Sequence, residues 1–166
     1  MGSTDSMEIL EMLTPVPTYH HALIRLRSDH PTQFIDLTGR LQQIVERARI
    51  HCGIVNVQTL HTTTAVVVNE LEPLLLDDFA TLLDDAAPRH VPYRHDDVRQ
   101  RTVNVTADER VNGHAHCRAL LLGSSVSLNI VDGVLRLGQW QRVLMAELDG
   151  PRTREISVVV MGERRR

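Results

Sequence analysis

The stretch Ile156-Ser-Val-Val-Val-Met161 says more about the fold class than any other part of the sequence. Its side chains are apolar at every position except Ser157, and they include three consecutive valines. Short apolar runs rich in Val and Ile are typical of buried strands. The stretch therefore predicts a central strand of a sheet near the end of the chain.

Strand patterns continue outward from this segment. After Tyr19, the side chains of Ala22, Ile24 and Leu26 recur at every second position, which predicts an edge or half-buried strand. Asp132-Gly133 is a typical hairpin turn between two further strands. The remaining predicted strands cover residues 53–60, 62–68, 126–131, 134–137 and 143–148.

Three segments follow a helical period. Residues 37–48 form an amphipathic helix, and residues 114–122 form a shorter one that ends at Gly123. A loop over residues 87–111 precedes the shorter helix, and so long a loop within a compact domain is often functional. The third helix starts near Pro73, and its predicted buried face carries Leu75, Phe79, Leu82, Leu83 and Ala86.

This order of elements predicts a compact single domain of the α+β class, in which antiparallel pairing dominates. The length of 166 residues suits one domain. Residues 18–163 are expected to form it. Residues 1–17, with their Gly, Ser and Pro, are expected to be a disordered leader.

Composition excludes several classes of function. Aromatic residues make up only 3% of the chain and the net charge is -3, so no nucleic-acid partner is expected. No apolar run approaches the roughly 20 residues that span a bilayer, so no membrane partner is expected. Cys52 and Cys117 belong to no CxxC motif, and no signal peptide is recognisable, which predicts a cytoplasmic protein.

All 18 basic residues are Arg. Without Lys, Schiff-base chemistry and a P-loop lysine are excluded. Planar guanidinium groups remain available to bind phosphate or carboxylate.

The segment Asn112-Gly-His-Ala-His116 contains two histidines two residues apart. In a helix their side chains point about 200° apart, whereas in an extended segment they point the same way. We favour the helix. His116 then shares a face with Ala119 and Leu120 and points toward the protein, while His114 is expected at the surface.

A second cluster runs from His61-Thr-Thr-Thr64 to Asn69-Glu70. On a straight strand His61 and Glu70 would point to opposite faces. They can share one pocket only if the chain bends near residues 62–64 or if Glu70 lies beyond the strand end. The threonines are equally compatible with a ladder of side chains across neighbouring strands.

Two later clusters could also take part in binding or catalysis. His95 with Asp96-Asp97 could ligate a metal ion, although the helical HExxH pattern of metalloproteases is absent. Arg152 and Arg154 lie on the same side of an extended segment and could bind an anionic group. Trp140 either lines a pocket or fills the rim of the core.

In this order, these clusters resemble the YjbQ family from about residue 19 to residue 162. The matching motifs are His61-Thr-Thr with Asn69-Glu70, Asp78, Tyr93-x-His95, Asn112-x-x-Ala-His116, Gly123-x-Ser125, Asp132-Gly133, Leu137-Gly-x-Trp-Gln141, Glu147 and Asp149-Gly-Pro-Arg-x-Arg154. Thr64 and Gln139 depart from the residues usual in the family.

The resemblance implies a β-sandwich with flanking helices, a homotrimer, and a pocket with histidines, acids and a bound metal. It also implies a secondary thiamine-phosphate synthase, a transferase that joins an aminopyrimidine methyl diphosphate to a thiazole phosphate. A metal-dependent hydrolase and a non-enzymatic trimeric metabolite-binding protein are the alternatives.

The expected site has three groups of residues. The catalytic residues are His61, Glu70 and His116. A divalent metal, zinc rather than magnesium because imidazole suits zinc, is expected on His95, His116, His61 and Asp78. A phosphorylated small-molecule substrate is expected to contact Thr62, Thr63, Asn112, Trp140, Arg152 and Arg154.

Overall fold

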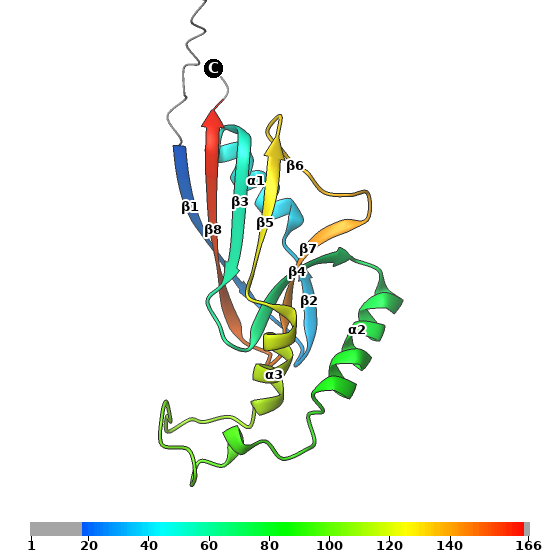
Figure 1. Cartoon of the computed structure of the whole chain (residues 1–166), viewed down its shortest axis with the longest axis vertical. Coiled ribbons are helices and arrows are strands. Elements are labelled where there is room, and N and C mark those ends of the chain that lie inside the picture. Colours follow the sequence, from blue (N-terminus) through cyan, green and yellow to red (C-terminus); the bar gives the residue numbers. More distant parts are fainter. Residues whose placement is uncertain (1–17, 165–166) are drawn as a thin grey trace, which may run out of the picture.

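The computed structural model describes residues 18–164, so the predicted leader lies outside the described residues. Two antiparallel sheets form the body of the protein (Figure 1). The larger sheet has the order β1-β8-β3-β5-β6, and the smaller has the order β2-β7-β4. The strands are β1 (Thr18–Arg27), β2 (Gln33–Asp36), β3 (Ile50–Thr59), β4 (Thr64–Glu70), β5 (Ser125–Val131), β6 (Val134–Leu135), β7 (Gln141–Glu147) and β8 (Thr153–Arg164). The expected α+β class with mostly antiparallel pairing is confirmed.

The predicted central strand is confirmed as part of β8, which pairs with β1 on one side and β3 on the other. Ile156, Val158 and Val160 point to one face of β8 and are buried in the main core. The helix α1 (Thr38–Ala48) covers this core with Leu41 and Val45. The apolar run thus lies in an interior strand of the larger sheet, with a paired strand on each side.

One strand was not predicted, and another is displaced along the chain from its predicted position. β2 was not predicted, since its four residues are too few to show a period. The strand predicted over residues 62–68 covers Thr64–Glu70 instead, so Glu70 is its last residue. β4 and β2 both pair with β7, and this smaller sheet lies below the larger one in Figure 1.

The helix α2 (Pro73–Ala86) lies beside the smaller sheet (Figure 1), where Phe79 packs edge-on against Phe34 of β2. The predicted buried face was partly wrong, because only Leu83 of α2 is buried and Leu82 is 65% exposed. The helical period was predicted correctly, but most side chains on this face are not buried against the rest of the chain. No helix within residues 18–164 is long and apolar enough to cross a membrane.

The predicted loop contains one 3-10 turn, η1 (Arg94–Asp96), and leads into α3 (Gly113–Leu122). The carboxylate of Asp96 accepts hydrogen bonds from the backbone N–H groups of Asn112, at 3.0 Å, and Gly113, at 2.9 Å. These bonds satisfy N–H groups that a helix start leaves unpaired. The loop is therefore attached to the first turn of α3.

Candidate functional site

The turn between β7 and β8 is held by a buried ion pair. Arg154 donates to Glu147 from Nε at 2.7 Å and from Nη2 at 2.6 Å. The Ser28 hydroxyl and the backbone N–H groups of Leu148 and Asp149 donate to the same carboxylate. Burial alone would raise the pKa of Glu147, but the hydrogen bonds from Arg154 and the backbone hold it below its usual value. Glu147 stays ionised and fixes the guanidinium of Arg154.

Asp149 connects this turn to the start of α3. Its buried carboxylate accepts a hydrogen bond from Nδ2 of Asn112 at 3.0 Å. It also lies 3.2 Å from Nη1 of Arg152 and 3.6 Å from Nε of Arg110. Together with Arg154, three guanidinium groups gather around the two carboxylates of this region, so its net charge is positive.

His61 follows β3 and lies against β8. Its Nε2 accepts a hydrogen bond from the backbone N–H of Glu155 at 2.9 Å. Burial is the largest cause that lowers the pKa of His61, and the charge of Arg154 lowers it further against the opposing effect of Glu147. The imidazole is therefore neutral at pH 7.

Two adjoining cavities share His61, Thr62 and His116 as a common wall. The first, of about 220 Å³, is polar, and its remaining lining residues are Leu60, Thr63, Asn112, Arg152 and Arg154. The second, of about 310 Å³, is more apolar and extends along α3 past Ala119 and Leu120. The geometry suits a small molecule with an anionic end and a less polar end.

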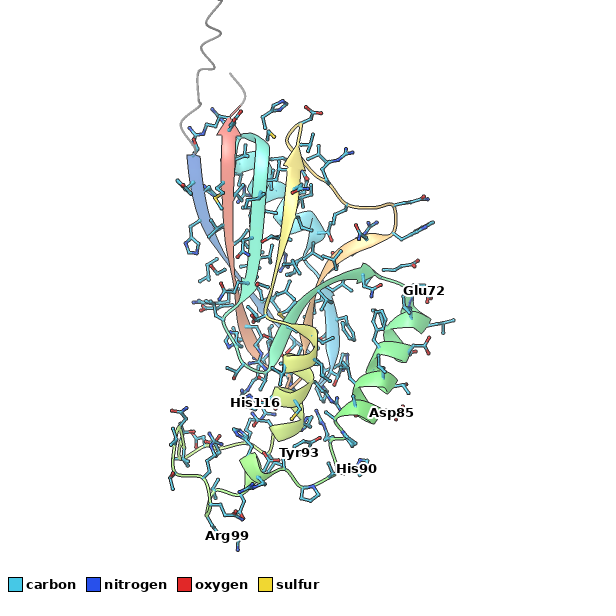
Figure 2. The ribbon with its side chains drawn as sticks, viewed as in Figure 1. Glu72, Asp85, His90, Tyr93, Arg99 and His116 are labelled. Atoms are coloured by element: carbon cyan, nitrogen blue, oxygen red, sulfur yellow. The ribbon has the colours of Figure 1, made fainter. Side chains whose placement is uncertain are left out.

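His116 and His95 lie side by side, with ring centroids 4.5 Å apart. Burial, then the neighbouring His95, lowers the pKa of His116. Nη1 of Arg101 lies 3.2 Å from Nε2 of His95 and 2.8 Å from the carboxylate of Glu109. Figure 2 shows His116 on α3, at the end of the molecule where the loop carrying Arg99 also lies. The loop thus contacts α3 where His95 of the loop lies against His116 of the helix.

The structure does not bring every expected residue to these cavities. Glu70 and Trp140 line a separate cavity of about 340 Å³ at the far end of β4. The six residue steps from Thr64 to Glu70 correspond to roughly 20 Å along a strand. Asp78 is exposed on α2, and none of these three residues lines a cavity with His61 and His116.

The surface position predicted for His114 is wrong. His114 is only 2% exposed, and its ring lies 6.4 Å from that of Tyr93. Neither ring nitrogen has a hydrogen-bond partner among the described residues. The helical phase of α3 was predicted correctly, but the loop that carries Tyr93 packs against the face expected to be open. His116 is half-buried in the cavity wall, as its predicted inward direction requires.

Glu147 and Asp149 were recognised only as parts of the family motifs and were assigned no role in the site, although both support it. A carboxylate within the apolar strand 143–148 and an Arg seven residues later could have indicated a buried pair. The sequence alone could not show that the two side chains meet across a turn.

The side chains expected to bind a metal ion do not form a complete site within one chain. Within residues 18–164 there is no group of three or more His, Cys, Asp and Glu side chains that could hold a metal ion. Of the expected ligands, His95 and His116 have their rings 4.5 Å apart, and the guanidinium of Arg101 lies against His95. These residues do not form a zinc site by themselves, so no chemical step is derived through a metal.

Comparison with known proteins identifies relatives over most of the chain. Residues 4–163 match the family described as UPF0047 protein YjbQ-like. A UPF0047 protein of Methanothermobacter thermautotrophicus is 36% identical over 138 residues, which are 83% of this chain and 89% of that protein. A UPF0047 protein of Archaeoglobus fulgidus is 38% identical over 135 residues, or 81% and 96% of the two chains.

Solved structures agree with this relationship. The crystal structure of a YbjQ-like protein of unknown function from Sulfolobus solfataricus matches with a TM-score of 0.80 and 30% identity. The match covers 89% of this chain and all of that one, 100%. A hypothetical protein from Aeropyrum pernix matches with a TM-score of 0.77 and 31% identity, over 87% and 99% of the two chains. The chain belongs to the UPF0047 protein YjbQ-like family.

Proposed function

We propose that the chain is a transferase of the thiamine-phosphate synthase type, which binds a phosphorylated small molecule in the two adjoining cavities. The observation that carries the proposal is that His61, Arg152 and Arg154 line one small polar cavity that opens beside an apolar one. Phosphate is recognised by such fixed donors, and Arg is particularly suited to it.

The polar cavity suits the leaving diphosphate. Glu147 and Asp149 hold two guanidinium groups in place, and Arg110 leaves the region with a net positive charge. Donors fixed before the reaction stabilise developing negative charge at no cost of reorganisation. Arg152 and Arg154 would therefore favour departure of the diphosphate.

The proposed reaction breaks the bond between the methylene carbon of the aminopyrimidine and the diphosphate oxygen. The bonding electron pair leaves with the diphosphate, and the lone pair of the thiazole nitrogen forms the new carbon–nitrogen bond. The apolar cavity along Ala119 and Leu120 offers space for a ring. No proton transfer is required for this bond exchange, so His61 and His116 would act through hydrogen bonds.

A second candidate function is hydrolysis, because His116 lies in the wall of both cavities and burial lowers its pKa, which keeps the imidazole neutral. A neutral imidazole in a cavity wall can accept a proton from water and so act as a general base. Hydrolysis of a phosphorylated substrate would then depend on His116, whereas the transferase reaction depends chiefly on the guanidinium groups. Release of inorganic phosphate from a generic phosphomonoester distinguishes the two functions.

We also propose that copies of this chain assemble, as expected for a homotrimer. On α2 the exposed Leu74 and Leu82 lie among the acidic side chains of Asp77, Asp78 and Asp85. Other exposed apolar side chains include Val111 and Leu120, and the loop before α3 carries the exposed arginines Arg94, Arg99 and Arg110. Opposite charges on α2 and on this loop suit a head-to-tail contact between identical chains, and such contacts form rings when the rotation closes.

The test of the transferase is product formation by purified protein from the aminopyrimidine methyl diphosphate and the thiazole phosphate. Thiamine phosphate should appear with the natural chain and fall at least about tenfold with Arg152→Ala, since a hydrogen bond to a charged group is lost. Arg40→Ala, an exposed position on α1, is the matched control and should keep full activity. Absence of product from the natural chain would reject the proposal.

A further inference from the structure

We infer that His61 acts as a neutral hydrogen-bond donor through Nδ1–H, and that it neither ligates a metal nor serves as a general base. The acceptor would be a phosphate oxygen of the bound ligand, and in this respect the inference rests on the proposed function. The assignment of the proton to Nδ1 rests on the fold alone.

The position of the proton follows from the partner of Nε2. The backbone N–H of Glu155 points at Nε2 from 2.9 Å, and a backbone amide nitrogen can only donate. Nε2 must therefore carry the lone pair. A neutral imidazole bears one proton, so that proton is on Nδ1.

The donor itself is fixed by the sheet. Glu155 lies in β8, where it is paired with Arg25 of β1, and its carbonyl accepts a hydrogen bond from the backbone N–H of Leu60 at 3.2 Å. His61 is the next residue after Leu60, so the imidazole and the amide are held together by neighbouring strands. Rotating the ring to exchange its nitrogens would leave the Glu155 N–H without this acceptor.

The free nitrogen, Nδ1, is accessible to solvent on a residue that lines both cavities. Nδ1 has no hydrogen-bond partner among the described residues, yet it is not among the unpartnered side-chain atoms that are sealed from solvent. His61 lines both the polar and the apolar cavity. Its donor therefore joins those of Arg152 and Arg154, and the acceptors that suit such a set are phosphate or diphosphate oxygens.

The same geometry argues against metal binding and against general-base catalysis by His61. A metal ion or an abstracted proton needs a nitrogen lone pair, and the only lone pair of this tautomer already accepts from Glu155. Binding a metal at Nδ1 would require loss of the Nδ1 proton. We thus assign His61 to ligand binding, in contrast to the metal-ligand role implied by the family resemblance.

The tautomer can be measured directly by nitrogen NMR of the histidine side chains in the full-length protein. We expect the His61 resonances at pH 7 to show a protonated Nδ1 and an unprotonated Nε2, with the assignment confirmed by their loss in His61→Asn. Equimolar zinc should leave the Nδ1 proton in place. The opposite tautomer, or loss of that proton to zinc, would overturn the inference and leave the proposed function standing.

The donor role is tested with inorganic pyrophosphate as the probe. Pyrophosphate should shift the Nδ1 resonance of His61, and His61→Ala should weaken its binding about tenfold or more. His61→Asn places an amide donor near the position of Nδ1 and should recover most of the affinity, while His61→Gln places its amide near Nε2 and should not. Binding without any effect at Nδ1 overturns the donor role alone. If the natural chain does not bind pyrophosphate, the proposed function and the phosphate role of His61 both fail.

Discussion

The guanidinium of Arg154, which lines the polar cavity, lies 2.6 Å from the carboxylate of Glu147, and both side chains are buried. The pair joins the end of β7 to the start of β8, and Nη2 of Arg154 also donates to the hydroxyl of Thr63 at 3.1 Å. Buried ion pairs stabilise little relative to apolar packing, but breaking one leaves a buried charge. The pair therefore suits a role in holding the cavity wall.

Glu147→Gln should lower the free energy of unfolding by about 3 kcal/mol, because it leaves the buried Arg154 without its counter-charge. Urea unfolding at pH 7 measures this loss. The exposed Glu163→Gln is the control and should change stability by less than about 0.5 kcal/mol. Equal stability of the two variants would contradict a structural role for the pair.

Because the folded-state pKa of Glu147 is lowered, its contribution to stability is present above the unfolded pKa of about 4.3. That contribution is lost as pH falls through the lower, folded value. Glu147→Gln should accordingly differ most from the natural chain near neutral pH and least in strong acid. Unfolding curves at pH 7 and pH 3 provide the comparison.

His114 should make the fold sensitive to moderate acid. Burial and then Arg89 lower its pKa, so protonation favours the unfolded state. The destabilisation by His114 is absent above the unfolded pKa of about 6.5. It grows as pH falls below that value toward the folded pKa. His114→Leu should reduce the loss of stability between pH 7 and pH 5 and also remove two unpartnered buried nitrogens. A loss that is the same in both proteins would contradict this account.

Asp96→Ala should loosen the start of α3, since two backbone N–H groups lose their acceptor. We expect about 1 kcal/mol of destabilisation, as for other lost helix caps, and faster hydrogen exchange in the first turn of α3. The exposed Asp108→Ala, in the same loop, is the control. Unchanged exchange at Asn112 and Gly113 would show that the loop does not hold the helix.

Leu82→Asp should weaken assembly of the chain without unfolding it, because Leu82 is exposed within a single chain. Sedimentation velocity measures the oligomeric state, and circular dichroism checks the fold. The charge-matched control Gln43→Asp is at an exposed position on α1, outside the proposed surface. The surface on α2 would be excluded if Leu82→Asp assembles like the natural chain.

The elements with clear periods were predictable, and those that depend on tertiary contacts were not. Ile156–Met161 was recognised as a central strand because its composition alone requires burial. His114 was misplaced because the helical phase cannot show that Tyr93 packs on the same turn. Glu70 was expected near His61, but it is the last residue of β4 and lines a separate cavity.

The site shows the same division. Arg152 and Arg154 were expected on one side of an extended segment, and the structure brings both to the polar cavity with His61 and His116. Their support by Glu147 and Asp149 depends on a turn whose geometry no local pattern contains. A lone sequence shows which side chains are available, whereas the fold decides which carboxylate meets which guanidinium.

Binding of a phosphorylated ligand in the cavity lined by His61, Arg152 and Arg154 underlies the proposed function. Calorimetric titration of the purified protein with pyrophosphate tests it most directly, with Arg152→Ala and the control Arg40→Ala measured alongside. We expect one site per chain, affinity at least about tenfold weaker in Arg152→Ala, and no change in Arg40→Ala. No binding to the natural chain, or equal binding by all three proteins, would contradict it.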